Sequence, residues 1–127
     1  MTQDDKRKYT RYSCSIKTEF NFYEGNPDEI DTDTEISRKG KGVIIDISCG
    51  GVFIISNSRV SPGLPIILKF QVKKEKLAVN GRIVRTGLLK NNPSEVARKF
   101  SKFSSKGNNY IAVEFDKPLE NYDFSTL

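Results

Sequence analysis

The chain has 127 residues, no histidine, and a formal net charge of +5 from 21 Lys and Arg against 16 Asp and Glu. This length suits one domain with its own hydrophobic core, and the lack of histidine removes the commonest general base and most zinc sites. The two cysteines, Cys14 and Cys49, form no Cys-x-x-Cys pattern, so we expect free thiols rather than a disulfide framework or a metal site.

Hydropathy and charge indicate the compartment of the protein and the kind of partner it binds. No stretch approaches the roughly 18 uninterrupted apolar residues of a spanning helix, and MTQDDKRKYT at the N-terminus has no apolar run, so we expect no signal peptide. We therefore expect a cytoplasmic protein without membrane insertion. Six acidic residues lie between Glu24 and Glu35, which leaves 10 acidic against 21 basic residues elsewhere. This imbalance favours an anionic partner such as a phosphate ester, a nucleic acid or an acidic protein surface.

The first expected strand covers residues 15–22, where core-type side chains alternate with polar ones. Residues 23–42 follow as a long acidic loop, because they are rich in Gly, Pro and Asn and show no sustained period. A calcium loop starting at Asp31 would need Gly at its sixth position and Glu at its twelfth, and the sequence has neither. We expect a solvated loop and no metal.

Two apolar runs at residues 42–47 and 51–56 predict a hairpin with DISCGG at its turn. Further strands are expected at residues 65–72, 77–87 and 108–116. A charged turn, KKEK, separates the first two of these. Gly81, inside a strand, indicates a bulge or a close approach of the backbone. Six short strands predict an all-β fold, and closure into a six-stranded antiparallel β-barrel avoids unpaired edges.

Residues 92–103 predict a short amphipathic helix before the last strand. Asn92 suits the N-cap, Pro93 suits the first helical position, and apolar residues then recur at helical spacing. The tail, residues 118–127, is compatible with a short C-terminal helix or with an irregular segment. No pattern assigns a role to Cys49.

Arg7 and Arg11 form an Arg-x-x-x-Arg pair just before the first strand. Alone, such a pair is typical of a solvated basic tail. Each guanidinium is also a planar fork that can bind phosphate or the O6/N7 edge of guanine. Lys6 and Lys8 add attraction for phosphate without that geometry and rank below the arginines. Tyr9 and Tyr12 are available for stacking, although an aromatic residue beside a first strand more often belongs to the core or its rim.

The hairpin turn contains a second polar motif, in which Asp and Ser bond backbone amides and Gly supplies positive φ. These roles explain the stretch without any ligand. Alternation along a strand places Asp46 and Ser48 on one face, opposite Ile47. If Ile47 faces the core, both polar side chains point outward, where Gly50 and Gly51 let a ligand approach the backbone.

The order, spacing and strand context of Arg-x-x-x-Arg and Asp-x-Ser-x-x-Gly resemble the PilZ domain family, bacterial receptors for cyclic dimeric GMP (c-di-GMP). The stretches SPG, NGRIVR at 80–85 and IAVEF at 111–115 are similar to later parts of the family. The resemblance spans nearly the whole chain, although Ala112 replaces a common glycine. It implies a six-stranded antiparallel barrel on which the acidic loop and the helix are insertions.

The resemblance also implies a site. The residues carried over by motif are Arg7, Arg11, Asp46, Ser48 and Gly51. The arginines would hold phosphates and guanine edges, and the others would form the barrel side of the site. We expect a flexible N-terminal arm, residues 1–14, on a barrel domain, residues 15–127. The arm would be poorly ordered without ligand and would fold over the barrel on binding.

The predicted function is a c-di-GMP receptor or effector, without a cofactor, that signals to an unidentified protein partner by a conformational change. One alternative is a small basic barrel that binds single-stranded nucleic acid, as OB-folds do; aromatic residues at core-facing positions argue against it. Another is a ligand-independent PilZ-like adaptor, which the completeness of both motifs disfavours. An enzyme is not expected, because no nucleophile and base pair is present.

Overall fold

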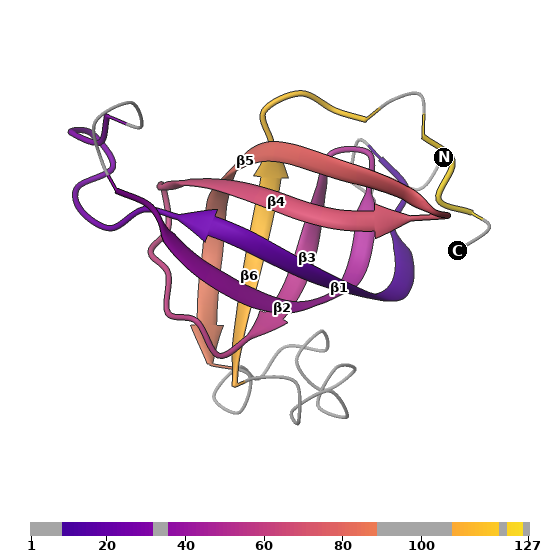
Figure 1. Ribbon diagram of the computed structural model, residues 1–127, viewed down its shortest axis with the longest axis horizontal. Helices are drawn as coiled ribbons and strands as arrows, with labels where there is room; N and C mark the ends of the chain where they lie inside the picture. Colours follow the sequence, from indigo (N-terminus) through magenta and orange to yellow (C-terminus); the bar gives the residue numbers. More distant parts are fainter. Residues whose placement is uncertain (1–8, 32–35, 89–107, 120–121, 126–127) are drawn as a thin grey trace, which may run out of the picture.

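A computed structural model describes residues 9–31, 36–88, 108–119 and 122–125. Its strands are β1 (Tyr12–Phe22), β2 (Arg38–Ser48), β3 (Gly51–Ser56), β4 (Pro65–Val72), β5 (Glu75–Leu88) and β6 (Asn109–Phe115) (Figure 1). They pair antiparallel in the order β1-β2-β3-β6-β5-β4, and β4 pairs with β1 to close the barrel. The expected six-stranded antiparallel β-barrel is therefore confirmed.

The described residues contain no helix. The predicted helix at residues 92–103 lies outside them, as do residues 32–35 of the acidic loop. Accordingly, the described part of the chain has no helix of the length and apolar character needed to cross a membrane.

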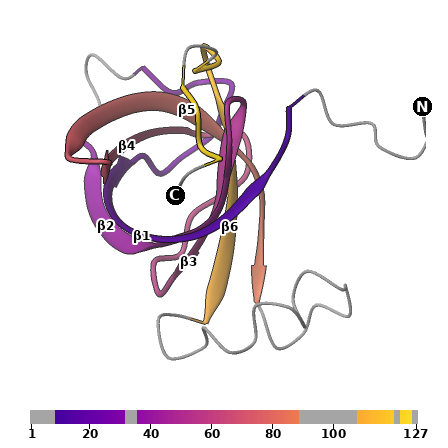
Figure 2. The ribbon, with the colours of Figure 1, turned by 90° about the vertical axis from the view of Figure 1, so that its right-hand side faces the viewer.

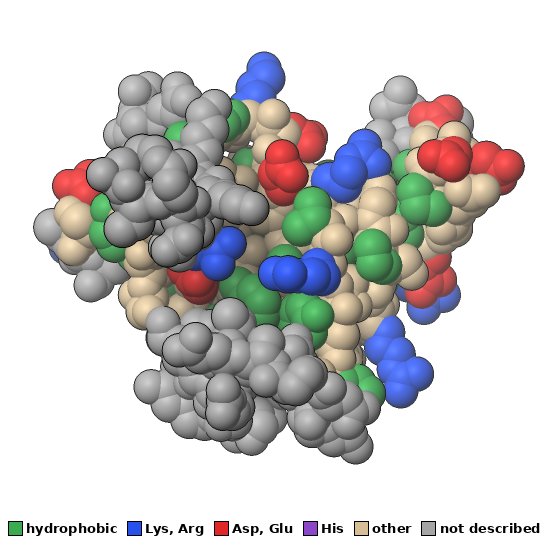
Figure 3. Space-filling model, turned by 180° about the vertical axis from the view of Figure 1, so that it is seen from behind, with side chains coloured by type: hydrophobic (Ala, Val, Ile, Leu, Met, Phe, Trp, Pro, Cys, Tyr) green, Lys and Arg blue, Asp and Glu red, His purple; other side chains and the backbone are tan. Residues whose placement is uncertain are grey.

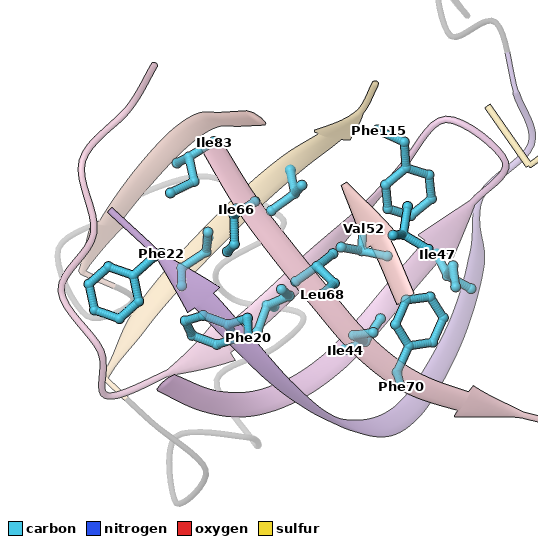
Figure 4. Close-up of a cluster of buried hydrophobic side chains, with 14 of the residues drawn as sticks. Phe20, Phe22, Ile44, Ile47, Val52, Ile66, Leu68, Phe70, Ile83 and Phe115 are labelled. Atoms are coloured by element: carbon cyan, nitrogen blue, oxygen red, sulfur yellow. The ribbon is translucent and has the colours of Figure 1, made fainter. Parts of the chain in front are cut away.

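The barrel interior is filled by large aliphatic and aromatic side chains from all six strands (Figure 4). Those at its centre include Phe20, Phe22, Ile44, Ile47, Val52, Ile66, Leu68, Phe70, Ile83 and Phe115. Complete burial of such a side chain contributes about 1.5–3 kcal/mol. The aromatic residues of the strands thus mainly serve packing, as the sequence pattern indicated.

The strand β2 begins at Arg38, so residues 38–42 of the predicted loop belong to a strand and that loop boundary was wrong. The first half of β2 carries lysines on its outer face and glycines on its inner face. A Cβ added to Gly40 would lie 2.5 Å from Cε2 of Phe20, so this ring fills the inward space. No apolar side chain therefore marks the start of β2 in the sequence.

The turn between β4 and β5 consists of Lys73 and Lys74 alone and is shorter than the four-residue turn expected. Both lysines have positive φ angles, 51° and 73°, as in the tight hairpin turns that match strand twist. The close approach expected at Gly81 is confirmed. A Cβ added there would lie 2.7 Å from the carbonyl oxygen of Glu114 in β6.

The C-terminal tail packs against one end of the barrel (Figure 2). Phe124 is 1% exposed and stacks on Tyr122, with ring centroids 5.6 Å apart. The tail is tied to the β2–β3 turn, because the Leu119 N–H donates to the Cys49 carbonyl at 2.7 Å and the Cys49 thiol donates to the Tyr122 carbonyl at 3.6 Å. Cys49 therefore anchors the tail, and the tail's described residues are irregular rather than helical.

Candidate functional site

The sheet register brings the two sequence motifs together. The strand β1 begins at Tyr12, within the predicted arm, and Tyr12 pairs with Ile47 while Ser13 pairs with Asp46. Arg11 directly precedes this pairing. The second arginine of Arg-x-x-x-Arg and the aspartate of Asp-x-Ser-x-x-Gly therefore line the same part of the surface.

A β-bulge in β2 sets the direction of Asp46. Simple alternation from the inward-facing Ile44 would point Asp46 into the core. Instead, the pairing with β3 shifts between Ile44 and Asp46, which leaves Ile45 as the extra residue. The bulge reverses the alternation. Ile47 is consequently buried in the core, as expected, and Asp46 lies half-buried at the outer surface.

A second bulge, in β5, brings Arg85 to the same surface. The pairing of β5 with β6 shifts between Ile83 and Arg85, so Arg85 pairs with Ala112 and the intervening Val84 is 49% exposed. One row of partners across four neighbouring strands is Asp46, Phe53, Ala112 and Arg85. Because neighbouring strands lie about 4.8 Å apart, this row spans roughly 14 Å along the curved sheet.

The β2–β3 turn at one end of the surface is built by Ser48 and two glycines. The Gly50 N–H donates to the Ser48 hydroxyl at 3.2 Å, and this hydroxyl donates to the Gly51 carbonyl at 3.5 Å. Neither glycine has a positive φ, so the expectation that glycine supplies positive φ here was wrong. A Cβ on Gly51 would instead run into the Val113 carbonyl oxygen of β6. Close approach of two strands therefore explains Gly51.

Together these elements enclose a groove of about 470 Å³ on the outer surface of the barrel. Its polar and small residues are Arg11, Asp46, Ser48, Gly50, Gly51, Arg85, Ala112 and Glu114, and Tyr9, Phe53, Val84 and Pro118 also line it. The strands β3 and β6 lie at the back of the barrel in Figure 1, and the view from behind shows basic and acidic side chains beside hydrophobic ones (Figure 3).

The groove combines an apolar floor with charges of both signs. Phe53 is the aromatic residue of the row, and its ring stacks on Tyr110 with centroids 5.2 Å apart and an interplanar angle of 8°. Such a floor can support a planar base, while guanidinium groups and carboxylates at its rim can bind the polar edges of that base and phosphates. The groove is thus suited to a nucleotide-like anion.

Cys14 lies close enough to Asp46 for the charge of this carboxylate to affect the pKa of its thiol. Burial raises the pKa of the Cys14 thiol to about 12, and the negative charge of Asp46 adds to the increase. The thiol donates to the Ile44 carbonyl at 3.5 Å. Cys14 and Cys49 are both free, as the sequence predicted, and at neutral pH Cys14 is a protonated, structural thiol.

The predicted site is only partly within the described residues. The structure brings together Arg11 and the four predicted groove residues of the β2–β3 hairpin, which are Asp46, Ser48, Gly50 and Gly51. The other predicted ligands, Lys6, Arg7 and Lys8, lie outside the described residues. Sequence reasoning missed Arg85 and Glu114. In the sequence, the stretches that contain them, NGRIVR and IAVEF, show only a similarity to strands of the family.

Comparison with known proteins agrees with this architecture. The family model described as PilZ domain matches residues 5–123, which is more than half of the chain. The chain belongs to the PilZ domain family. No curated protein matches it.

Two solved structures share the PilZ fold with this chain. The inhibitor of motility MotI/DgrA of Bacillus subtilis is 14% identical, with a TM-score of 0.58 over 93% of this chain and 46% of its own, so the chain spans about half of that protein. The PilZ domain of YcgR from Escherichia coli, whose structure contains c-di-GMP, is 9% identical, with a TM-score of 0.54 over 88% of this chain and 79% of its own. At these identities the likeness shows the fold alone.

Proposed function

We propose that this protein is a bacterial c-di-GMP receptor that binds the dinucleotide in the groove over β2, β3, β6 and β5 and passes the signal to a protein partner. The observation that carries the proposal is the pairing of Tyr12 with Ile47. Arg11 therefore lies beside the Asp46 to Gly51 turn, which supports one surface shared by the second arginine of Arg-x-x-x-Arg and the other PilZ-type motif. Family membership and the c-di-GMP found with the YcgR domain support the choice of ligand.

The chemistry of the ligand matches that of the groove. The dinucleotide carries two phosphate charges and two guanines, each with acceptors on one edge and N–H donors on another. Arg7 and Arg11 bind the phosphates and the O6/N7 edges of the guanines. Asp46 accepts hydrogen bonds from guanine N–H groups or orients an arginine. The Ser48 hydroxyl is already hydrogen-bonded within the turn, to the Gly50 N–H and the Gly51 carbonyl. Its role in the proposal is therefore to hold the turn in shape.

Two charged residues on β5 and β6, Arg85 and Glu114, also line the groove and extend the proposed site. Arg85 adds a third guanidinium, at the other end of the row from Asp46, and Glu114 pairs with Gly51 two rows further along, beyond the Val52–Val113 pair. The row spans roughly 14 Å along the curved sheet, which exceeds the width of one base and leaves room for a second planar group. A mononucleotide could contact the Asp46 end or the Arg85 end of the row, but not both.

The arm is the conformational element of the proposal. Ligand binding would fix Arg7 against the groove beside Arg11 and order the polar segment that contains Arg7. Amide hydrogen exchange over residues 4–12 measures this ordering directly. We expect slower exchange in the presence of c-di-GMP, whereas unchanged protection at saturation would rule out the conformational change.

Isothermal titration with c-di-GMP, GMP and cyclic AMP tests the function. We expect saturable binding of c-di-GMP and much weaker binding of the two mononucleotides. Titration with single-stranded oligonucleotides at about 50 and 200 mM salt tests the nucleic-acid alternative, which requires steep salt dependence and tolerance of sequence. Such oligonucleotide binding without c-di-GMP binding would contradict the proposal.

A further inference from the structure

The ring of Tyr9 lies against the backbone of Gly50 in the β2–β3 turn. A Cβ added to Gly50 would lie 2.7 Å from Cδ2 and 3.1 Å from Cε2 of this ring, closer than a side chain tolerates. Because Gly50 does not have a positive φ, its backbone would accept alanine without strain. The ring of Tyr9 is therefore what excludes a side chain at position 50.

Gly50 offers this ring a fixed surface. Its N–H donates to the Ser48 hydroxyl at 3.2 Å, and its carbonyl accepts from the Phe115 N–H of β6 at 2.9 Å. The peptide groups on both sides of Gly50 are thus held by β2 and by β6. The ring of Tyr9 therefore packs on a part of the groove that strands β2 and β6 hold in place.

We propose that Tyr9 is a positioning residue that fastens the segment before β1 to the β2–β3 turn and so presents Arg11 to the groove. This inference rests on the proposed function. The chain is held at Tyr9 by the ring and from Tyr12 onward by strand pairing, so that Thr10 and Arg11 alone lie between two fixed points. Arg11 is consequently confined to the rim of the groove.

The ligand then meets an arginine, Arg11, whose position is already restricted before binding. Such preorganisation increases affinity without adding a contact to the ligand.

Titration of c-di-GMP against four variants tests the role. Tyr9→Ala and Gly50→Ala should each raise Kd about tenfold, as expected when one residue is no longer held in place. The double variant should be no weaker than the weaker single variant, because both changes remove one contact. Tyr9→Phe keeps the ring and should bind more tightly than Tyr9→Ala, and the control Thr10→Ala in the same segment should stay within about twofold of wild type.

A spectrum of the ligand-free protein separates the contact from the function. In a ¹H–¹⁵N correlation spectrum, Tyr9→Ala should shift the Gly50 amide, because a ring current is lost, and should leave the Gly25 amide unchanged. An unshifted Gly50 amide would overturn the contact, and additive losses or tighter binding by Tyr9→Ala would overturn the positioning role. If wild-type protein fails to bind c-di-GMP, the proposed function and this role both fall, whereas the Gly50 shift still reports the contact.

Discussion

Asp46 and Arg85 face the same groove because each follows a β-bulge in its own strand. The shift in β2 lies between Ile44 and Asp46, and the shift in β5 lies between Ile83 and Arg85. Without the extra residues, alternation from the buried isoleucines would direct both charged side chains into the core. Two local irregularities of the barrel thus create opposite ends of one polar surface.

Arg85→Ala should weaken c-di-GMP binding about tenfold to a hundredfold, because loss of one charged hydrogen-bonding partner costs about 1.5–3 kcal/mol. The side chain is exposed in the ligand-free protein, so the melting temperature should barely change. Titration calorimetry measures the affinity, and Arg59→Ala, an exposed arginine outside the groove, is the matched control. Equal affinity in the two variants would exclude Arg85 from the site.

Arg11→Ala should cause a loss of the same size, and Arg7→Ala should do so as well. Arg11→Lys keeps the charge but lacks the planar fork, so its affinity should lie between those of wild type and the alanine variant. Fluorescence or calorimetric titration ranks the variants. A lysine variant as tight as wild type would show that attraction between charges, rather than bidentate geometry, dominates at this position.

Cys14 should react slowly with iodoacetamide in the folded protein. In a Cys49→Ser background at pH 8, the raised pKa of Cys14 leaves little thiolate, so labelling should be about a thousandfold slower than in the unfolded chain. Asp46→Asn removes a negative charge that raises this pKa and should speed the labelling. If Asp46→Asn leaves the rate unchanged, the charge of Asp46 does not act on the thiol.

The contribution of Cys14 to the stability of the folded protein depends on pH, and the raised pKa of its thiol sets the direction of that dependence. Because folding raises the pKa of Cys14, any stabilisation from the protonated thiol is fully present below the unfolded pKa near 9 and is lost as the pH rises toward about 12. Cys14→Ser should therefore flatten the alkaline limb of the stability curve. An unchanged limb would show that other groups determine it.

Phe124→Ala should destabilise the protein by about 3–5 kcal/mol, as is typical when a buried phenylalanine is removed. Phe124 is 1% exposed and packs at the end of the barrel through a tail that Cys49 anchors. Urea denaturation measures the loss, with Lys117→Ala, an exposed residue before the tail, as the control. A change below about 1 kcal/mol would mean that the tail does not stabilise the barrel.

Strands whose inward positions carry apolar side chains were predictable from the sequence, and closure of the barrel followed from their number. The start of β2 was not, because Gly40 faces the core and a ring from another strand fills its space. The β4–β5 turn was also missed, since Lys73 and Lys74 adopt positive φ without the Asn or Gly that usually marks such a turn.

The candidate site was predictable where it forms a linear motif, as at Asp46 and Ser48. Arg85 was missed because its direction depends on a bulge, which one extra residue creates without a composition signal. The role of Gly50 was missed for a different reason. Its steric partner, Tyr9, is distant in sequence, so only the folded chain shows that the glycine is needed for space rather than for φ.

Mapping c-di-GMP by amide chemical-shift changes tests the central claim most directly. The account predicts that the largest changes at saturation fall on residues 46–53, 84–86 and 112–114, which line or flank the groove. The partners Lys41, Glu19 and Lys69, on the outer faces of β2, β1 and β4, should be unaffected. Changes centred on those three residues, or none at saturating ligand, would contradict the proposed site.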